Sequence, residues 1–473
     1  MNATSIAIIV ATVLVILATI IPTYVITNRK KTTEDDWAIA DRSLPLYVVV
    51  GTQFASAMGG GVLVAHVGNA FKNGIGHFLY GVLASLPFIC IMYLAKWLRR
   101  HNYTTIPEIL RTFTNNNKAV TIIAALMTLI VPYGWVTSQI TAFGNIYAKL
   151  TGLDYNTLCI VFAVIALLFV MPSGLKTVAW TDFLFSCFMC VICVICVVYV
   201  TVMGGGWGQI SANLNAQDPN LLSFFGSLTD NIGVSAAMLW IFAVLPGGLT
   251  NQIYFQRVCA IDDEKKVNKS LILSAIASVL SFVWAVYMGL SIRSINPEAG
   301  GNGATAWFMG ELPLVLMALF AALVFATMMS TTSSGVQTAV MNITRDILPI
   351  VAPNLDSKKT LKISRLLSLA LMVLAILMCL VFTDTLTWLT ATYAFSAATL
   401  ACPIFVSYAF RKKQFITTAG VVAGMIAGLA GCILGMILKT TISYAAVGIA
   451  CSFVAMMVVC AATRGKNAVK LED

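Results

Sequence analysis

Long apolar stretches, separated by short polar connections, run along the whole chain. The hydrocarbon core of a bilayer is ~30 Å thick, and a helix needs about 20 apolar residues to cross it. Continuous apolar runs of this length predict transmembrane helices, whereas a transmembrane barrel would show alternating polar and apolar positions. Thirteen such stretches are found, at residues 5–27, 45–70, 77–98, 119–149, 156–172, 177–203, 231–256, 268–292, 313–341, 361–382, 386–409, 415–437 and 441–462.

The composition supports the same class. Of the 473 residues, 59% are apolar and 10% are charged, against about a quarter charged in soluble domains. This balance excludes a soluble globular protein and predicts an all-α polytopic membrane protein of the plasma (inner) membrane. The formal net charge of +10 could suggest a nucleic-acid surface, but the basic residues occur singly or in small groups between apolar runs. We therefore expect no nucleic-acid partner and interpret these residues as topology signals.

The distribution of Lys and Arg predicts the orientation of the spans. If the N-terminus lies outside, all but four of the 29 basic residues fall on the cytoplasmic side, as the positive-inside rule requires. The first stretch lacks a basic leader and is followed by basic residues 29–31, which favours a retained span over a cleaved signal peptide. We expect an external N-terminus, a cytoplasmic C-terminus and no soluble domain. The four exceptions are Lys72, Lys149, Arg293 and Lys439.

Two predicted spans contain helix-breaking clusters near their middles, Gly59-Gly60-Gly61 in the second and Pro246-Gly247-Gly248 in the seventh. Glycine and proline cost about 1 and 3 kcal/mol in a helix interior, so both spans should break there, unless the small residues serve close helix packing. Breaks five helices apart predict two five-helix units inserted in opposite orientations, which is typical of secondary transporters. The expected organisation is one transporter domain over residues 1–473, comprising an extra N-terminal helix and loop (1–44), two repeats (45–203 and 231–410) and two C-terminal helices (414–473).

Two features of the spans could hold cations. The ninth span carries six hydroxyl residues within Thr327–Ser334, and positions 327, 330, 331 and 334 share one helix face. Such oxygen atoms suit hard cations, although Ser and Thr also bond to their own backbone or join helices. Asp182 lies just inside the start of the sixth span, where an ionised carboxylate needs a partner. That partner would be a bound cation, unless Asp182 extends to cytoplasmic water near Lys176.

The cysteines and histidines indicate no catalytic or metal site. Four cysteines at three-residue steps (187–196) fan around a helix instead of gathering for an iron–sulfur cluster. The three histidines have no metal-ligand spacing. We therefore expect no enzyme activity and no cofactor.

Three motifs resemble those of the sodium:solute symporter family. Residues 173–182 (SGLKTVAWTD) are similar to the beginning of a family helix marked by Gly and by a closing Thr-Asp. Residues 251–260 (NQIYFQRVCA) are similar to its Asn-Gln-x-x-x-Gln-Arg-x-x-Ala stretch, and Met329-Ser330-Thr331 with Asp346 resembles its Met-Ser-Thr…Asp helix. The resemblance covers essentially the whole chain. It implies thirteen helices with an external N-terminus around a LeuT-like five-plus-five core.

The resemblance also implies site residues by position. The family's main sodium site corresponds to Ala55, Met58, Thr327, Ser330 and Thr331. A second sodium site, present in some members, corresponds to Asp182, Ser333 and Ser334. Candidates for solute binding or gating are Gln139, Asn251, Gln252 and Tyr254, although Gln139 could equally make a structural bond between helices.

Departures from the family pattern disfavour proline as the solute. Members that carry proline have an Asp where this chain has Ala57, and they have Trp, Tyr and Pro where it has Val244, Gly248 and Gln252. Asn251 and Tyr254 are similar to a pair in sugar-carrying members, but the pattern is too common to name a sugar.

These observations predict sodium-coupled symport of a small organic solute by alternating access, with sodium as the coupling ion and the lipid bilayer as the surroundings. Proton coupling through Asp182 is an alternative. A channel would favour repeated filter elements or rings of charge, and a ligand-binding sensor would favour a signalling domain. The sequence shows neither feature.

Overall fold

The computed structural model describes residues 3–27, 39–170, 174–381, 385–440 and 442–464. Over these residues the chain forms helices joined by turns and short connections, and the one bridge between extended residues joins Leu44 to Ile261. The predicted all-helical class is therefore confirmed. Its cause is the continuous apolar runs, in which a helix satisfies every backbone N–H and C=O within the segment.

Among the described residues, 11 helices are long and apolar enough to cross a membrane. Three of these spans contain two α-helices in succession, namely α12 with α13, α16 with α17, and α19 with α20. The bounds are α1 (Ala3–Thr27), α5 (Phe78–Arg100), α7 (Lys118–Thr151), α9 (Leu175–Met203), α12 (Val234–Leu249), α13 (Gln252–Ala260), α14 (Val267–Ile295), α16 (Leu314–Asn342), α17 (Leu348–Val351), α18 (Ser357–Val381), α19 (Thr385–Ser396), α20 (Cys402–Ala409), α21 (Thr418–Ile437) and α22 (Tyr444–Ala462).

The second predicted span adds a twelfth crossing when its two halves are taken together. α3 (Leu46–Ala57) ends before the triple glycine, and a π-helical turn, η2 (Gly61–His66), leads into α4 (Val67–Asn73). The two halves are bent by 50°. The bend lies where the glycine cluster predicted it.

The fifth predicted span, 156–172, corresponds to α8 (Tyr155–Val170) as far as the described residues extend. Its 16 residues span only about 24 Å, which is less than the hydrocarbon core. α8 is therefore not counted among the crossing helices, and thirteen spans remain a prediction.

The seventh span is interrupted later than the sequence predicted. α12 continues through Pro246-Gly247-Gly248, and the non-helical residues are Thr250 and Asn251. Asn251 is extended, and its side chain accepts a hydrogen bond of 3.0 Å from the N–H of Ile253. The capping asparagine therefore starts a new helix, α13, and fixes the position of the break.

The two glycines of α12 serve close packing instead. A Cβ on Gly247 would lie 2.6 Å from the carbonyl oxygen of Tyr393, and a Cβ on Gly248 would lie 2.4 Å from Cγ of Pro87. The expected break at these residues is corrected accordingly, because they let α12 approach α19 and α5.

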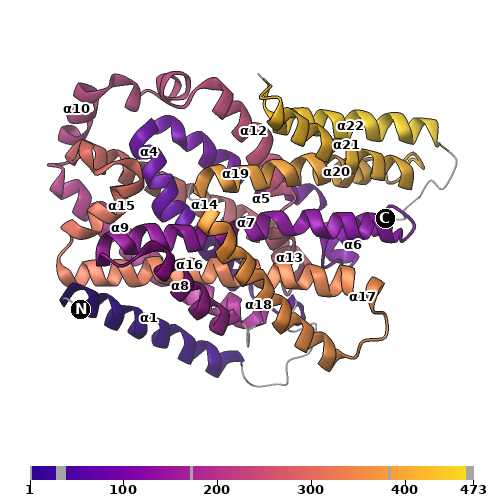
Figure 1. Cartoon of the computed structure of the whole chain (residues 1–473), viewed down its shortest axis with the longest axis horizontal. Coiled ribbons are helices and arrows are strands. Elements are labelled where there is room, and N and C mark those ends of the chain that lie inside the picture. Colours follow the sequence, from indigo (N-terminus) through magenta and orange to yellow (C-terminus); the bar gives the residue numbers. More distant parts are fainter. Residues whose placement is uncertain (1–2, 28–38, 171–173, 382–384, 441, 465–473) are drawn as a thin grey trace.

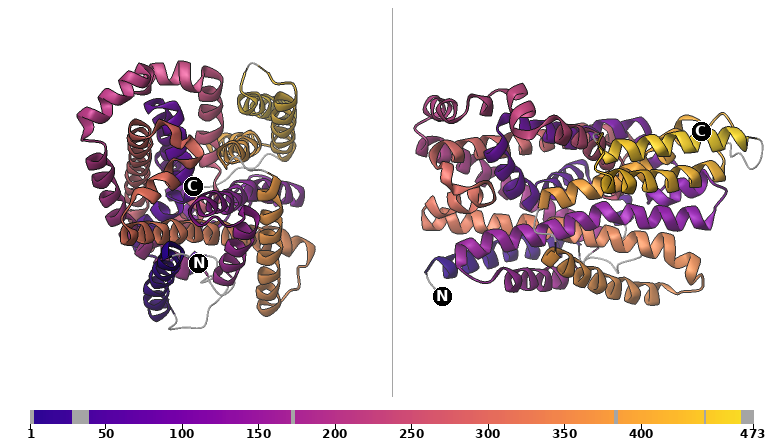
Figure 2. Two further views of the ribbon diagram at one scale, coloured as in Figure 1. Left: turned by 60° about the vertical axis from the view of Figure 1, so that its left-hand side comes forward. Right: turned by 45° about the horizontal axis from the view of Figure 1, so that its top comes forward.

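α16 runs through the middle of the helix bundle, while α1 and the hairpin of α21 and α22 lie at opposite sides (Figure 1). The same arrangement is seen from two further directions (Figure 2). Every residue of α16 from Phe320 to Asn342 is buried. The peripheral helices instead expose large apolar side chains, such as Val202 at 74% and Leu366 at 65%, which is typical of surfaces in contact with lipid. The chain is a multi-pass membrane protein.

The longer connections contain short helices of their own. In the connection 204–230, Ile210 and Leu214 pack on Leu290 of α14 in one apolar cluster. The connection 204–230 therefore packs against α14. The short helices are α6 (Ile106–Thr112), α10 (Trp207–Gln217), α11 (Phe224–Gly226) and α15 (Ala304–Glu311).

Candidate functional site

The break after α3 is the centre of the candidate site. A Cβ on Gly59 would lie 2.4 Å from Oγ1 of Thr331 and 2.7 Å from Oε1 of Gln139. The N–H of Gly60 donates to the same Gln139 oxygen at 2.6 Å. Glycine is therefore required at position 59 because side chains of α16 and α7 contact the opened backbone.

The hydroxyl face of α16 faces this break. Thr331 Oγ1 donates to the carbonyl of Ser56 at 3.2 Å and to that of Thr327 at 3.0 Å. The structure thus brings Thr331 to the end of α3, where Ala55 and Met58 are both buried. Thr327 uses its hydroxyl within α16, donating to the Val324 carbonyl at 2.9 Å. The result is a buried group of carbonyl and hydroxyl oxygens, the ligand type that hard cations prefer.

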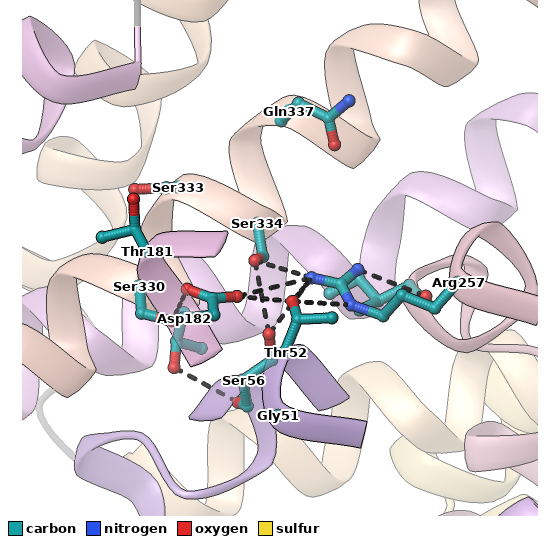
Figure 3. A network of polar contacts seen from close by, with 12 residues as sticks. Gly51, Thr52, Ser56, Thr181, Asp182, Arg257, Ser330, Ser333, Ser334 and Gln337 are labelled. Atoms are coloured by element: carbon teal, nitrogen blue, oxygen red, sulfur yellow. Dashed lines mark hydrogen bonds and ion pairs between the residues drawn. The ribbon is translucent and has the colours of Figure 1, made fainter. Parts of the chain in front are cut away.

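Asp182 of α9 is buried beside the same helices (Figure 3). Its Oδ2 accepts a hydrogen bond of 2.6 Å from Thr52, and its Oδ1 accepts one from Ser330. The side chain is 1% exposed, so the alternative in which it reaches cytoplasmic water near Lys176 does not hold. Ser330, expected at the main sodium site, thereby also bonds to the predicted second site.

The cation that faces Asp182 is an arginine that belongs to a family motif and to the predicted topology signals, and it was not predicted to be a site residue. Arg257 of α13 is fully buried, and its Nη2 lies 3.9 Å from Oδ2 of Asp182. Nη2 also donates to Ser334 at 2.8 Å and to Ser56 at 3.2 Å. The available signal was an acid inside a span that needed a partner, together with an Arg in the Asn-Gln-x-x-x-Gln-Arg motif.

The two predicted serines of the second site differ in position. Ser334 belongs to the network of Asp182 and Arg257, whereas Ser333 lies apart from it (Figure 3). Ser333 donates to the carbonyl of Met329 at 2.6 Å, within its own helix. The structure therefore groups Asp182 with Ser334 and Ser330 rather than with Ser333.

A cavity of about 50 Å³ lies next to the break in α3. This volume holds only a few water-sized molecules. Aromatic rings, hydroxyls, one amide and one imidazole form its wall. The lining residues are Ser56, Ala57, Gly59, Gly61, Val62, His66, Tyr80, Ala84, Trp135, Ser138, Gln139, Tyr254, Ser278, Phe282, Thr331, Leu389 and Tyr393.

Tyr254 closes the cavity on the side of α13. Its ring packs against Phe88 at a centroid distance of 4.3 Å and edge-on against Trp135 at 6.0 Å. Trp135 in turn donates from Nε1 to the hydroxyl of Tyr393 at 2.9 Å. This aromatic layer joins α5, α7, α13 and α19, so a movement of α13 would open or close it.

The other polar candidates differ in what they contact. Gln139 lines the cavity and bonds to Gly60, so it fits both the solute and the structural interpretation. Asn251 caps α13 and does not line the cavity. Gln252 points to the connection before α6, where it donates to the Thr104 carbonyl at 2.8 Å and accepts from the Ile106 N–H at 2.9 Å.

His66 and His77 form a pair that sequence reasoning set aside. Nδ1 of His66 and Nε2 of His77 are 2.9 Å apart, and both rings are buried. The rings pack among Tyr80, Trp240 and Phe282. The ten residues between them cross the turn from α4 to α5, so no helical period links them in the sequence. His66 lines the cavity and gives it a polar group in an aromatic surround.

Within the described residues, no group of three or more His, Cys, Asp or Glu side chains could hold a metal ion. The oxygen groups at the break instead combine hydroxyls and backbone carbonyls with one carboxylate.

Comparisons with known proteins agree with this architecture. The chain is 24% identical over 358 residues to the high-affinity proline transporter PutP of Bacillus subtilis (strain 168), covering 72% of this chain and 74% of that protein. It is 21% identical over 387 residues to the sodium/glucose cotransporter of Vibrio parahaemolyticus, covering 74% and 69%. It is 24% identical over 357 residues to the sodium/sialic acid symporter NanT of Aliivibrio fischeri (strain ATCC 700601 / ES114), covering 72% and 70%.

Solved structures share the fold. A Na+-coupled sialic acid symporter in a substrate-bound outward-open state aligns over 99% of both chains, with a TM-score of 0.84 and 17% sequence identity. Mhp1, a nucleobase-cation-symport-1 family transporter in a closed conformation, aligns over 92% of this chain and 97% of its own, with a TM-score of 0.57 and 14% identity. Residues 37–428, most of the chain, match the sodium:solute symporter family, and the chain therefore belongs to that family.

Proposed function

We propose that this sodium-coupled symporter binds its solute in the cavity beside the break in α3 and a sodium ion at the break itself. The proposal rests on one observation: the cavity and the break in the second span are bordered by some of the same residues. Ser56, Gly59 and Thr331 line the cavity, and the same three residues form the contact between the break and α16. Because one set of atoms faces both sites, an ion bound at the break would shape the solute site, which is the differential interaction that coupling needs.

The proposed main sodium ligands are Ala55, Met58, Thr327, Ser330 and Thr331. Support comes from the burial of all five residues and from the bond of Thr331 to the end of α3. Thr327 would have to release the Val324 carbonyl to contribute its hydroxyl, or else contribute its own carbonyl.

A second sodium ion is proposed at Asp182, with Ser334 and Ser330 as neighbours. Ser333 completes this site only if it exchanges its bond to the Met329 carbonyl for the ion. A carboxylate supplies the negative charge that a buried cation requires.

The solute is proposed to carry no net charge. None of the residues that line the cavity is Asp, Glu, Lys or Arg. Burying an ion without an opposite charge is costly, whereas hydroxyl, amide and imidazole groups can satisfy a neutral polar solute. Proline stays disfavoured on the residues named above. A solute larger than a few waters requires the aromatic layer under α13 to move.

We further propose thirteen spans with an external N-terminus, a cytoplasmic C-terminus and two inverted five-helix repeats within a single transporter domain of the plasma (inner) membrane. The charge distribution and the two interrupted spans support this arrangement. Each sodium ion that enters down an inside-negative potential of 100 mV would contribute about 2.3 kcal/mol to accumulation.

Uptake into proteoliposomes tests the proposal. A panel of labelled neutral, zwitterionic and anionic solutes, including proline, glucose and sialic acid, is offered with an inward sodium, lithium or proton gradient. The expected result is accumulation of a neutral solute with sodium that stops when the gradient is dissipated. Uptake that follows a pH gradient and ignores sodium would contradict it in favour of proton coupling. Preferential uptake of an anion would contradict the proposed absence of net charge on the solute and would leave sodium coupling unaffected.

A further inference from the structure

Arg257 of α13 and Asp182 of α9 form a buried ion pair. Their side chains are 0% and 1% exposed. Three other ion pairs in the described part of the chain lie at the surface, among them Arg100–Glu264. Removing one partner of a buried pair leaves a charge without compensation, so the position of each charge inside this protein has a large energetic consequence.

The two charges are neighbours without a direct hydrogen bond. Nη2 of Arg257 is 3.9 Å from Oδ2 of Asp182, beyond hydrogen-bond distance. The carboxylate instead accepts hydrogen bonds from Thr52 and Ser330, and the guanidinium donates to Thr52 at 3.2 Å. Hydroxyl groups therefore mediate the contact, and either charge can separate without breaking a bidentate pair (Figure 3).

The guanidinium uses the oxygens that the second sodium ion would need. It faces Asp182, and it donates to Ser334 at 2.8 Å and to Ser56 at 3.2 Å. A sodium ion coordinated by Asp182 and Ser334 would lie within a few ångströms of this positive charge. At such separations in a buried site, like charges repel strongly. Sodium and Arg257 cannot both be bound here.

Arg257 lies on a helix that begins directly after an interruption of the seventh span. α13 is separated from α12 by the non-helical residues Thr250 and Asn251, and it also carries Tyr254, which closes the solute cavity. Asp182 and Ser334 lie on the long helices α9 and α16. A shift of α13 about this interruption would withdraw the guanidinium and displace Tyr254 in the same step.

We propose that Arg257 is a tethered cation that competes with sodium for Asp182 and Ser334, so that the second sodium ion binds only when α13 moves the guanidinium away. The inference rests on the second ion site of the proposed function. It makes Arg257 a positioning residue that links ion binding at α9 and α16 to the aromatic closure of the cavity by α13.

Sodium binding to the purified, full-length protein tests this competition. Thermal unfolding is followed across a sodium chloride series, with potassium chloride keeping the ionic strength constant, for the wild type, Arg257→Gln and Arg257→Lys. Arg257→Gln removes the competing charge, so the sodium concentration for half-maximal stabilisation should fall by about tenfold or more. Arg257→Lys keeps a positive charge and should stay closer to the wild type. A sodium response in Arg257→Gln that equals or is weaker than that of the wild type would overturn the proposal.

The double variant Asp182→Asn/Arg257→Gln covers the case in which Arg257→Gln does not fold, since it removes both buried charges together. If sodium replaces Arg257 beside Asp182 during transport, this variant should move one sodium ion per solute where the wild type moves two. If the Arg257–Asp182 pair instead stays intact throughout transport, the variant should keep the wild-type ratio of sodium to solute. That result would refute the replacement of Arg257 by sodium. The ratio is read from the reversal potential of solute flux in proteoliposomes.

Arg100→Gln is the matched control, because it removes the same charge from a surface pair of 2.8 Å with Glu264. Its sodium response should equal that of the wild type. Failure of the wild type to respond to sodium in both assays would refute the proposed function itself. If the wild type responds to sodium and the Arg257 variants respond in the same way, only the competition between Arg257 and sodium is refuted.

Discussion

Substitution of Gly59 by alanine is the sharpest test of the break as an ion site. The added Cβ would lie 2.4 Å from Oγ1 of Thr331 and 2.7 Å from Oε1 of Gln139. The Gln139 oxygen belongs to the end of a long side chain and can move, whereas Thr331 is short and β-branched and must rotate its hydroxyl away. Overpacking of this kind costs about 1–3 kcal/mol.

The expected effect on sodium follows from that rotation. Loss of one hydroxyl ligand should cost ~1–2 kcal/mol, by analogy with charge-assisted hydrogen bonds. Since about 1.4 kcal/mol corresponds to a factor of ten, the sodium concentration for half-maximal uptake should rise roughly 5- to 30-fold. Initial uptake rates in proteoliposomes, measured across a sodium series and normalised to protein amount, give this value.

Gly61→Ala provides the control within the same break. A Cβ at Gly61 would meet no atom within 4 Å, and the residue begins the helical turn η2. Because Gly61 also lines the cavity, the sodium series is run at saturating solute, where its sodium dependence should stay within about twofold of the wild type. Equal shifts for Gly59→Ala and Gly61→Ala would refute the reasoning, because flexibility rather than the Thr331 hydroxyl would then control sodium.

Three further predictions concern the ions, the topology and the solute. Ser330→Ala and Thr331→Ala should each weaken sodium activation several-fold, by ~1–2 kcal/mol per hydroxyl, and unchanged activation at normal expression would make the hydroxyl face structural. A tag inserted in residues 258–267 should be protected from an external protease in intact cells while one near residue 215 is cleaved, and cleavage at both would overturn the orientation. His66→Phe removes a polar group from the cavity wall, so solute affinity should fall by roughly five- to a hundredfold, while the sodium-dependent thermal shift without solute stays at the wild-type value. Loss of the thermal shift instead would assign His66 to the ion site or the fold.

The break after α3 could be predicted from the sequence because three consecutive glycines weaken a helix at one point of an apolar span. Their role is local: no side chain fits at Gly59 beside Thr331 and Gln139. The sequence also predicted that Asp182 has a partner, because an ionised carboxylate inside a span needs one in any arrangement of the helices. Both predictions use properties of a short segment alone.

The partner of Asp182 could not be found in the same way. Arg257 stands next to a basic connection that the charge pattern predicts to be cytoplasmic, so its charge is interpreted as a topology signal, and it lies 75 positions after Asp182. Only the packing of α13 against α3, α5, α7 and α16 places this side chain in the interior. The shifted interruption of the seventh span has a similar cause: Asn251 caps α13, while the glycines before it allow close packing, and composition alone does not separate these uses. The His66–His77 pair depends on a turn whose geometry the sequence does not specify.

The buried ion pair of Arg257 and Asp182 has a consequence for the electrical behaviour of the transporter. If Arg257 stays beside Asp182 while no ion is bound, as the proposed exchange requires, the ion-free transporter carries no uncompensated charge at this position. A charge that crosses 100 mV changes the energy by about 2.3 kcal/mol, but a neutral pair that moves together changes it little. The membrane potential would therefore accelerate the inward step of the loaded transporter far more than the return of the empty one. At high solute and sodium concentrations, where the return limits turnover, the current should become nearly independent of voltage.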